Sequence, residues 1–158
     1  MDFPRGKALD IHREEVGDVM KVIRVGEVMT SDFPTMLSTM AAKEIANLAR
    51  STGHHGFPVL DERGRLFAVV TLADLERALR SGTADLPVGE IATQAPLVAY
   101  PDQSLYEVLQ ATAEDYGRIP VVDRQDKGRL VGVLHRHDII RAYRQRLAQT
   151  REAGKGFS

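Results

Sequence analysis

The sequence contains the stretch GRLFAVVTLADL at residues 64–75 and a second version of it, GRLVGVLHRHDI, at residues 128–139. In each copy an apolar run of strand length leads into a segment with the apolar spacing of a helix. Just ahead of these stretches, GFPVLD at 56–61 returns as RIPVVD at 118–123. A short turn separates the two apolar runs of each copy, which predicts a β-hairpin in each.

A third motif opens each copy, because VGEVMT at 25–30 returns as VGEIAT at 88–93. The copies lie 62 to 64 residues apart throughout. A period of that length, present twice, indicates two small packed units rather than a solenoid. Units of this size bury too little surface to be secure alone, so we expect them to pack together with a ligand cleft between them.

The composition excludes several classes of function. The chain has 158 residues, 43% hydrophobic content, 27% charged residues, a net charge of −1 and no cysteine. Disulfides, thiolate catalysis and cysteine-based zinc sites are therefore excluded. The near-neutral charge gives no global attraction to nucleic acid. There is no apolar run of membrane-spanning length and no apolar signal core, so we expect a cytoplasmic protein.

Each copy shows the same order of elements, β-α-β-β-α. The predicted extended pieces, helices and strands are 33–36, 41–49, 57–60, 66–70 and 72–80 in the first copy, and 97–100, 105–112, 119–122, 130–134 and 136–149 in the second. We predict an α+β (mixed α/β) fold in which the two units pack sheet to sheet as a pseudo-twofold pair.

This pattern divides the chain into five parts. Residues 1–24 form a polar lead-in outside the core, 25–80 the first repeat, 81–87 a linker, 88–149 the second repeat and 150–158 a C-terminal tail.

The layout and its motifs resemble a tandem pair of CBS domains (cystathionine-β-synthase domains, or a Bateman module), over residues 22–147. The resemblance implies a regulatory module rather than an enzyme, with no catalytic residue, required cofactor or metal. It also implies ATP, ADP or AMP as a regulatory ligand in the cleft between the copies, and a homodimer.

A narrower resemblance concerns STGHHGFPVLD at 51–61, VTLADL at 70–75 and GVLHRHDIIRAY at 132–143. These stretches are similar to the cytoplasmic tail of ClC-type chloride channels and transporters, which implies a membrane channel domain in the same chain. Stand-alone CBS proteins share most of these features. A stand-alone sensor or dimerisation module therefore remains open, either without a nucleotide or with another ligand such as S-adenosylmethionine.

The family resemblance gives Thr71 and Asp74 a ligand role, with Asp74 accepting hydrogen bonds from the ribose and Thr71 contacting a phosphate. The alternative is a helix-capping box, with Thr71 as the N-cap and Asp74 three residues later. The second copy keeps the aspartate as Asp138 but has His135 in place of the threonine. Histidine is a poor N-cap, so capping explains Asp138 less well, although a carboxylate in a first helical turn is itself favourable.

The resemblance also assigns the residues before the two proline-containing strands to the base or the phosphates. It implies one cleft with His54, His55 and Asp138, and another with Tyr116, Arg118 and Asp74. Thr39 and Gln103, ahead of the first helix of each copy, are expected to make further base contacts.

Three alternatives accompany these assignments. His54 and His55 are equally consistent with partly exposed loop residues, and metal binding is disfavoured because no third ligand is suitably spaced. The arginines of the last predicted helix complement its dipole, and a nucleic-acid role is poorly supported because no aromatic stacking set accompanies them. No motif joins a nucleophile to a base, so catalysis is not expected.

Overall fold

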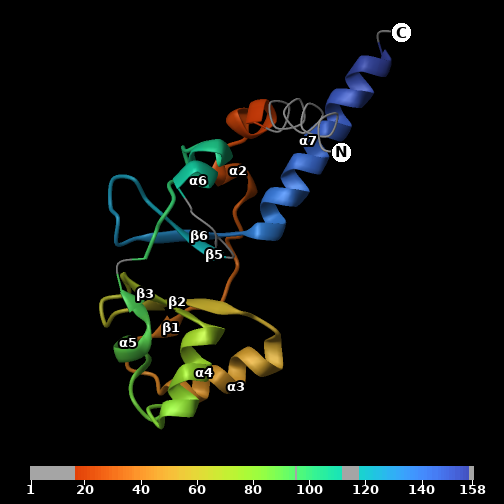
Figure 1. Cartoon of the computed structure of the whole chain (residues 1–158). Helices are drawn as coiled ribbons and strands as arrows, with labels where there is room; N and C mark the ends of the chain where they lie inside the picture. The colour runs from red at the N-terminus through yellow and green to blue at the C-terminus, as the bar shows by residue number, and fades with distance from the viewer. Residues whose placement is uncertain (1–16, 95, 112–117, 157–158) are drawn as a thin grey trace, which may run out of the picture.

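The computed structural model describes residues 17–94, 96–111 and 118–156, with only the backbone described from 150 onward. The chain forms two lobes whose sheets lie between the helices of one lobe and those of the other (Figure 1). The first lobe contains β1 (Met36–Leu37), α3 (Ala42–Thr52), β2 (Gly56–Leu60), β3 (Leu66–Thr71), α4 (Leu72–Ser81), α5 (Val88–Ile91) and β4 (Thr93–Gln94). The second contains α2 (Val25–Val28), α6 (Leu105–Ala111), β5 (Arg118–Val122), β6 (Leu130–His135) and α7 (Arg136–Gly156).

The two sheets have matching topologies. In the first lobe the order is β1-β2-β3-β4, with β1 parallel to β2 and both other pairs antiparallel. In the second lobe β5 and β6 form the hairpin, and single bridges extend it on both sides. Ala99 pairs in parallel with Val121, and Thr30 pairs antiparallel with Val133, so they take the places of β1 and β4. The predicted fold class is confirmed.

The helices form where apolar spacing and end signals agree. One face of α3 buries Ile45 and the alanines around it, and the helix ends at Gly53, whose φ of 74° is the left-handed conformation that glycine adopts readily. Helix α4 begins at a capping box formed by Thr71 and Asp74 and ends in the same way at Gly82, with φ 75°.

The opening motif of the second repeat packs on the first lobe. The backbone N–H of Val88 donates to the carbonyl of Met40 at 2.7 Å, and that of Gly89 donates to Ser38 at 2.9 Å. Val88 is fully buried in the first lobe's core, and β4 then extends the first sheet beside β3. A Cβ atom on Gly89 would lie 3.1 Å from the Ser38 carbonyl, so this approach is close.

The opening motif of the first repeat packs on the second lobe in the same manner. The N–H of Val25 donates to the carbonyl of Gln103, and that of Gly26 to Pro101, both at 2.9 Å. Val25 is fully buried in the second lobe's core. The two repeats therefore exchange their opening segments, and neither sequence repeat corresponds to one lobe.

The expectation that residues before 25 stay outside the core is wrong for the described part of that segment. Residues 17–22 are helical, and Met20 and Ile23 are 6% and 2% exposed within the second lobe's core. Charged residues alternate with these apolar residues in the sequence, so the segment has a polar average composition although one face of it is buried.

The last helix is longer than predicted. Helix α7 runs to Gly156, beyond the expected end at 149 and into the expected tail. The sequence from 144 to 153 is rich in arginine, glutamine and alanine, which favour helix, and it contains no proline to end one.

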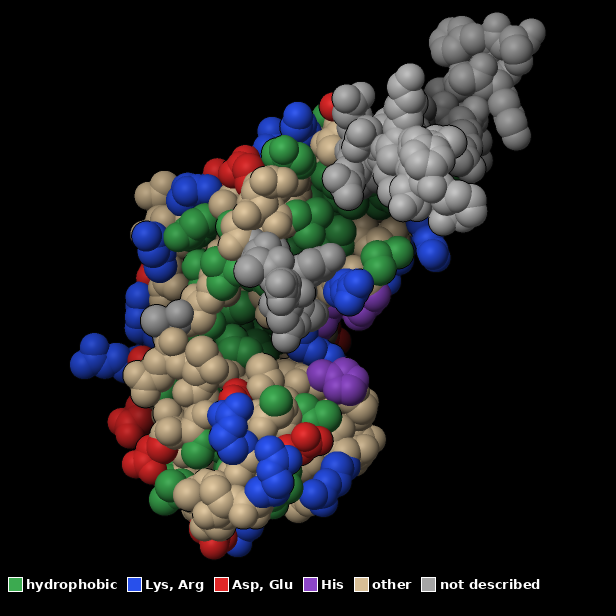
Figure 2. All heavy atoms as spheres, in the orientation of Figure 1, with side chains coloured by type: hydrophobic (Ala, Val, Ile, Leu, Met, Phe, Trp, Pro, Cys, Tyr) green, Lys and Arg blue, Asp and Glu red, His purple; other side chains and the backbone are tan. Residues whose placement is uncertain are grey.

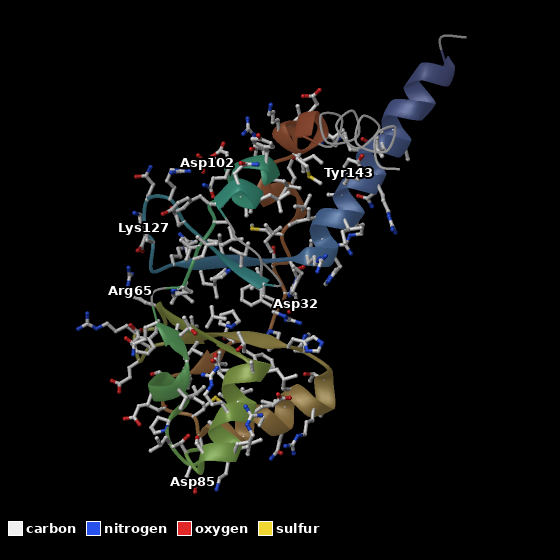
Figure 3. All side chains as sticks on the ribbon, viewed as in Figure 1. Asp32, Arg65, Asp85, Asp102, Lys127 and Tyr143 are labelled. Carbon is white, nitrogen blue, oxygen red and sulfur yellow. The ribbon has the colours of Figure 1, made fainter. Side chains whose placement is uncertain are left out.

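The two lobes meet on one side through their hairpin turns and leave a hollow on the other (Figure 2). Arg65 pairs with Asp126 through two hydrogen bonds of 2.6 and 3.3 Å, and the N–H of Leu66 donates to the carbonyl of Gly128. In Figure 3, Arg65 lies on this tied side of the junction and Asp32 on the opposite side. Asp126 belongs to the longer turn of the second hairpin.

Within the part of the chain that the structure describes, none of the helices is both long and apolar enough to span a membrane.

Candidate functional site

Asp138, in the first turn of α7, is completely buried and fully hydrogen-bonded. Its Oδ2 accepts hydrogen bonds from the backbone N–H of His135 at 2.9 Å, from His135 Nδ1 at 3.1 Å and from Thr30 Oγ1 at 3.1 Å. Its Oδ1 accepts from Arg141 Nη2 at 2.6 Å. Because Thr30 belongs to the first repeat, this carboxylate holds the exchanged segment on the second lobe.

Asp74, the equivalent carboxylate in the first lobe, has a simpler environment. Its Oδ2 accepts the N–H of Thr71 at 3.0 Å, while Thr71 Oγ1 accepts the N–H of Asp74 at 3.2 Å. The exposed Arg77 lies 3.4 Å from its Oδ1. The capping-box interpretation of these two residues is confirmed, while the predicted contacts with a ribose and a phosphate stay predictions.

The replacement of threonine by His135 keeps half of the capping box. The Asp138 carboxylate still accepts the N–H of residue 135, as Asp74 accepts that of residue 71. The side chain differs, because His135 Nδ1 turns toward the carboxylate. Helix capping therefore accounts for the position of the Asp138 carboxylate better than the replacement of threonine by His135 suggests.

His135 also contacts the other lobe through Arg118, the first residue of β5. Its Nε2 lies 3.4 Å from Arg118 Nη1, which in turn donates to the backbone carbonyl of Gly56 at 3.2 Å. Desolvation lowers the pKa of His135 below its ordinary value of 6.5, the hydrogen bond to Asp138 opposes this shift, and the charge of Arg118 adds to it. The imidazole is therefore favoured in its neutral form.

The larger part of the hollow between the lobes is a cavity of about 500 Å³ with a cationic lining. A second cavity of about 260 Å³ adjoins it and is lined mainly by apolar side chains. Both are lined by Gly56, Val69, Arg118, His135 and His137, so we treat them as one cleft. Figure 2 shows histidine side chains on both sides of the hollow.

The two ends of the cleft differ in chemistry. The apolar end is formed by Phe33, Pro34, Phe57, Pro58, Pro120 and Val133, with Thr30, Asp32 and His54 at its margin. The cationic end adds His55, Thr71, Leu72, Ala73 and Arg136 to the shared residues. The apolar end has rings and proline faces from both lobes, which suits a flat aromatic group.

The structure brings together five of the predicted site residues. His54, His55, Thr71, Arg118 and His135 line the cleft, and the half-buried His54 packs its ring edge-on against Phe57 at 5.8 Å.

Two predicted carboxylates and two predicted base contacts lie elsewhere. Asp74 and Asp138 stand behind the cleft lining rather than in it. Thr39 lies in a separate hollow beside Asp61 and Glu62. The side-chain oxygen of Gln103 accepts a hydrogen bond from the N–H of Tyr100 within its own turn. The structure therefore does not place Thr39 and Gln103 where they would contact a ligand in this cleft, and Tyr116 is outside the described residues.

Arg118 lines both cavities, with His54 in the apolar one and with Thr71 in the cationic one. The assignment of Arg118 to a cleft with Asp74 therefore stays a prediction, and the structure does not separate Arg118 from His54. The reason is the reach of the arginine, whose guanidinium crosses from β5 to the Gly56 carbonyl of β2.

Several cleft residues were not predicted. Asp32, Phe33 and Pro34 follow the exchanged segment, and His137 follows β6. Arg136, which the sequence offers as a substitute for the phosphate contact that His135 replaces, lines the cationic end. Thr30 has an available signal, because it is repeated as Thr93 at the end of the opening motif. Its partner Asp138 is 108 residues away and is reached only through the exchange.

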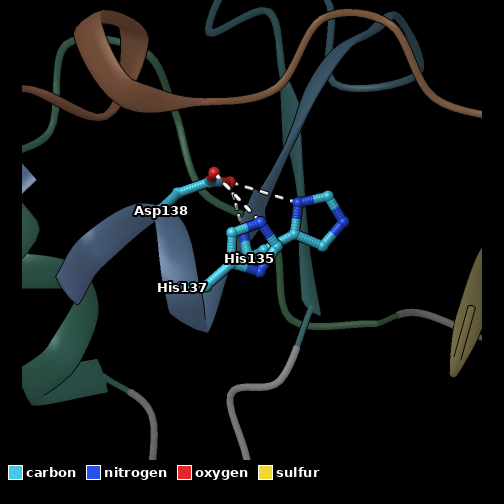
Figure 4. Close-up of side chains that lie close together, drawn as sticks. All are labelled: His135, His137 and Asp138. Atoms are coloured by element: carbon cyan, nitrogen blue, oxygen red, sulfur yellow. Dashed lines mark hydrogen bonds and ion pairs between the residues drawn. The ribbon is translucent and has the colours of Figure 1, made fainter. Parts of the chain in front are cut away.

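His135, His137 and Asp138 lie close enough to be considered as metal ligands, with candidate atoms within 4.8 Å of one another (Figure 4). The two imidazole rings stack with their centroids 5.0 Å apart. Both oxygens of Asp138 already accept hydrogen bonds, one of them from the guanidinium of Arg141. This arrangement is a hydrogen-bonded cluster, and the adjacent cation disfavours a divalent ion there.

Comparison with known families identifies the class of protein. The sequence model of the CBS domain matches the chain twice, over residues 25–81 and 88–145. The chain therefore belongs to the CBS-domain family and is a tandem CBS pair.

Curated relatives place such pairs in different contexts. The chloroplastic CBS domain-containing protein CBSX1 of Arabidopsis thaliana is 30% identical over 153 residues, covering 77% of this chain and 64% of that protein. Inosine-5'-monophosphate dehydrogenase of Methanocaldococcus jannaschii is 28% identical over 152 residues, covering 92% of this chain and 29% of the enzyme. The chain spans less than half the length of the first curated relatives it matches.

Solved structures with the same fold include two ligand complexes. CBSX2 in complex with AMP has a TM-score of 0.67 and 29% identity, covering 78% of this chain and 97% of that chain. The CBS domain pair of protein MJ0100, in complex with 5-methylthioadenosine and S-adenosyl-L-methionine, has a TM-score of 0.64 and 25% identity, with the same coverage.

Proposed function

We propose that this protein is a non-catalytic regulatory module that binds an adenine nucleotide in the cleft between its lobes. The observation that carries the proposal is the polarity of the cleft. Its apolar end suits a purine, and its cationic end, with Arg118 and Arg136, suits phosphate. The AMP complex of CBSX2 and the adenosine-derived ligands of the MJ0100 pair support an adenosine group as the ligand.

The cleft suits regulation because both lobes line it. The apolar wall combines Phe57 and Pro58 of the first lobe with Pro120 and Val133 of the second. A ligand held by both walls favours the lobe arrangement to which it binds more tightly. The protein would pass this change in arrangement to whatever domain or partner it contacts.

Calorimetric titration with AMP, ADP, ATP, adenosine and S-adenosylmethionine tests the proposal. We expect the phosphorylated ligands to bind more tightly than adenosine. Arg118→Gln should weaken AMP binding by about 10- to 100-fold, because a charge-assisted contact is worth roughly 1.5–3 kcal/mol.

A matched control is Arg124→Gln. Arg124 pairs with Asp102 on the surface and does not line the cleft, so AMP affinity should be unchanged. Absence of binding by all five ligands at millimolar concentration would contradict the proposal.

A second function, dimerisation, is favoured by apolar side chains on the outer helices of the first lobe. Leu48 of α3 and Leu79 of α4 are 37% and 41% exposed. We propose that a second copy of the chain covers them. Sedimentation should then show a dimer, and Leu48→Glu combined with Leu79→Glu should shift it toward monomer. A monomeric wild-type protein would contradict this.

The similarity of residues 51–61 and 132–143 to ClC-type tails extends the proposal to a host protein at the cytoplasmic face of a membrane. The alternative is a stand-alone CBS-pair sensor that is not part of a channel protein. The native reading frame distinguishes them, since a channel tail would follow many apolar spans of about 20 residues each.

A further inference from the structure

A continuous line of hydrogen-bonding groups crosses the junction at the cleft. It runs from the Asp138 carboxylate to His135 Nδ1, and from His135 Nε2 to Arg118 Nη1, with distances of 3.1 and 3.4 Å. Arg118 then reaches the Gly56 carbonyl of the first lobe at 3.2 Å. His135 is the one titratable member of the line that ionises near neutral pH.

The two ends of the imidazole fix its tautomer. The fully buried carboxylate of Asp138 can only accept at Nδ1, so the ring proton lies on Nδ1. Arg118 can only donate at the other end, so it requires the lone pair of Nε2. A second proton on Nε2 would remove this acceptor and place an imidazolium directly against a guanidinium.

An anion bound at the cationic end of the cleft would favour the protonated form of His135 over the neutral one. Phosphate oxygens accept hydrogen bonds, so one phosphate can accept from both Arg118 and a protonated Nε2. Both side chains line the cleft cavities. Arg118 would turn from the Gly56 carbonyl toward the phosphate, and the added negative charge would favour imidazolium.

We propose that binding of a phosphate-bearing ligand in this cleft is coupled to uptake of a proton by His135, so that affinity increases as the pH falls. This inference rests on the proposed nucleotide function and goes beyond it, because it makes the module sensitive to pH. The first lobe has Thr71 at the equivalent position, so the line of hydrogen bonds through a histidine to the helix carboxylate is particular to the second lobe.

Other charged groups around His135 contribute to the balance. The stacked ring of His137 and the side chains of Asp138 and Arg141 belong to α7, and Arg118 belongs to β5. Asp32, His54, His55 and Arg136 line the same cleft. Desolvation lowers the pKa of His135 in the free protein, which leaves room for a ligand to raise it near neutral pH.

The test is calorimetric titration of the full chain with AMP at a fixed pH near 6.5, in buffers with different ionisation enthalpies. The dependence of the heat on the buffer gives the number of protons taken up. His135→Asn keeps a donor toward Asp138 but does not titrate, so it should bind AMP with less proton uptake than the wild type. The ionisation of bound AMP differs between the two proteins, and phosphorus NMR of each complex measures that contribution so that it can be subtracted.

Arg124→Gln, which lies outside the cleft, is the matched control and should retain the proton uptake of the wild type. His137→Asn changes a cleft-lining ring that stacks on His135, and it should lose less proton uptake than His135→Asn does. Between pH 8 and pH 6 the wild type should gain about 3- to 10-fold in AMP affinity relative to His135→Asn. NMR titration of the wild-type His135 ring, with and without AMP, should show a higher pKa in the complex.

The outcomes separate the two proposals. AMP binding with equal proton uptake in the wild type and His135→Asn, or an unshifted His135 ring titration, would overturn the coupling and leave the nucleotide function standing. Absence of binding by AMP and by the other four ligands of the first titration would overturn the nucleotide function itself, and the coupling with it.

Discussion

The carboxylate of Asp138 is a structural tie as well as a candidate ligand group. Three donors approach one of its oxygens and a guanidinium approaches the other, and one of these donors, Thr30, comes from the exchanged segment. A ribose hydroxyl could bind this carboxylate only by replacing one of these donors. Asp74 has fewer partners and a more exposed environment, so the two equivalent aspartates are not interchangeable.

We predict that Asp138→Ala destabilises the fold more than Asp74→Ala. Loss of Asp138 leaves several buried donors unpaired, which should cost about 2–4 kcal/mol of unfolding free energy. Loss of Asp74 removes a capping box, at about 1 kcal/mol. Urea denaturation monitored by circular dichroism measures both. Equal losses would show that the Thr30 contact contributes little.

The pH dependence of stability should reveal His135 in the absence of any ligand. Its pKa in the folded state is below 6.5, chiefly because of desolvation. As the pH falls below 6.5 the unfolded chain therefore binds a proton before the folded chain does, and stability is lost. The contribution is fully present above this pH.

Urea denaturation at pH 8 and pH 5.5 checks this prediction. The wild type should lose more stability across this interval than His135→Asn does. If the wild type and His135→Asn lose the same amount, desolvation of the ring is not a significant factor.

Among the helices and strands, the exchanged opening motifs depend on glycine. A Cβ at Gly89 would meet the Ser38 carbonyl and Cβ at 3.1 Å and the Phe67 ring at 3.3 Å. Gly89→Val should therefore push α5 away from the first lobe and destabilise the protein by roughly 1–3 kcal/mol. Thermal unfolding measures the loss.

Gly53→Asn is a suitable control for Gly89→Val. Gly53 also requires a special backbone, with φ 74°, but a Cβ there would meet nothing within 4 Å. Asparagine tolerates this conformation, so we expect a small change. A loss as large as that of Gly89→Val would indicate that glycine flexibility, rather than close packing, explains both.

The sequence predicts these elements unequally well. The hairpins, α4 and its capping box follow from local patterns, since strand alternation, Thr71 and Asp74 all lie within a few residues of one another. The exchange could not be predicted because the opening motifs show a buried valine and a tight glycine without showing which lobe receives them. The reach of Arg118 across the junction is likewise a long-range contact.

At the scale of the complete fold, the exchange should make the two lobes unfold together. Each core contains residues from both repeats, such as Val88 in the first lobe and Val25 in the second. We predict a single cooperative transition, with the same midpoint for probes placed in either lobe.

Cutting the chain in the 81–87 linker tests the same point. The fragment with the second repeat loses Val25 and Thr30, and the fragment with the first repeat loses Val88. Each should be largely unfolded alone, and mixing them should restore the native circular dichroism and NMR spectra. Independent folding of either fragment would contradict this prediction.

The exchange also bears on how such a chain arises. A gene encoding one repeat would make a protein whose opening segment has no lobe of its own to fill, and whose lobe lacks that segment. Two such chains could satisfy each other by trading segments, as the two halves do here. Joining the genes would then replace a concentration-dependent encounter with a tethered one, at an effective concentration on the order of millimolar. Tethering would also free the two halves to differ, as Thr71 and His135 do at equivalent positions.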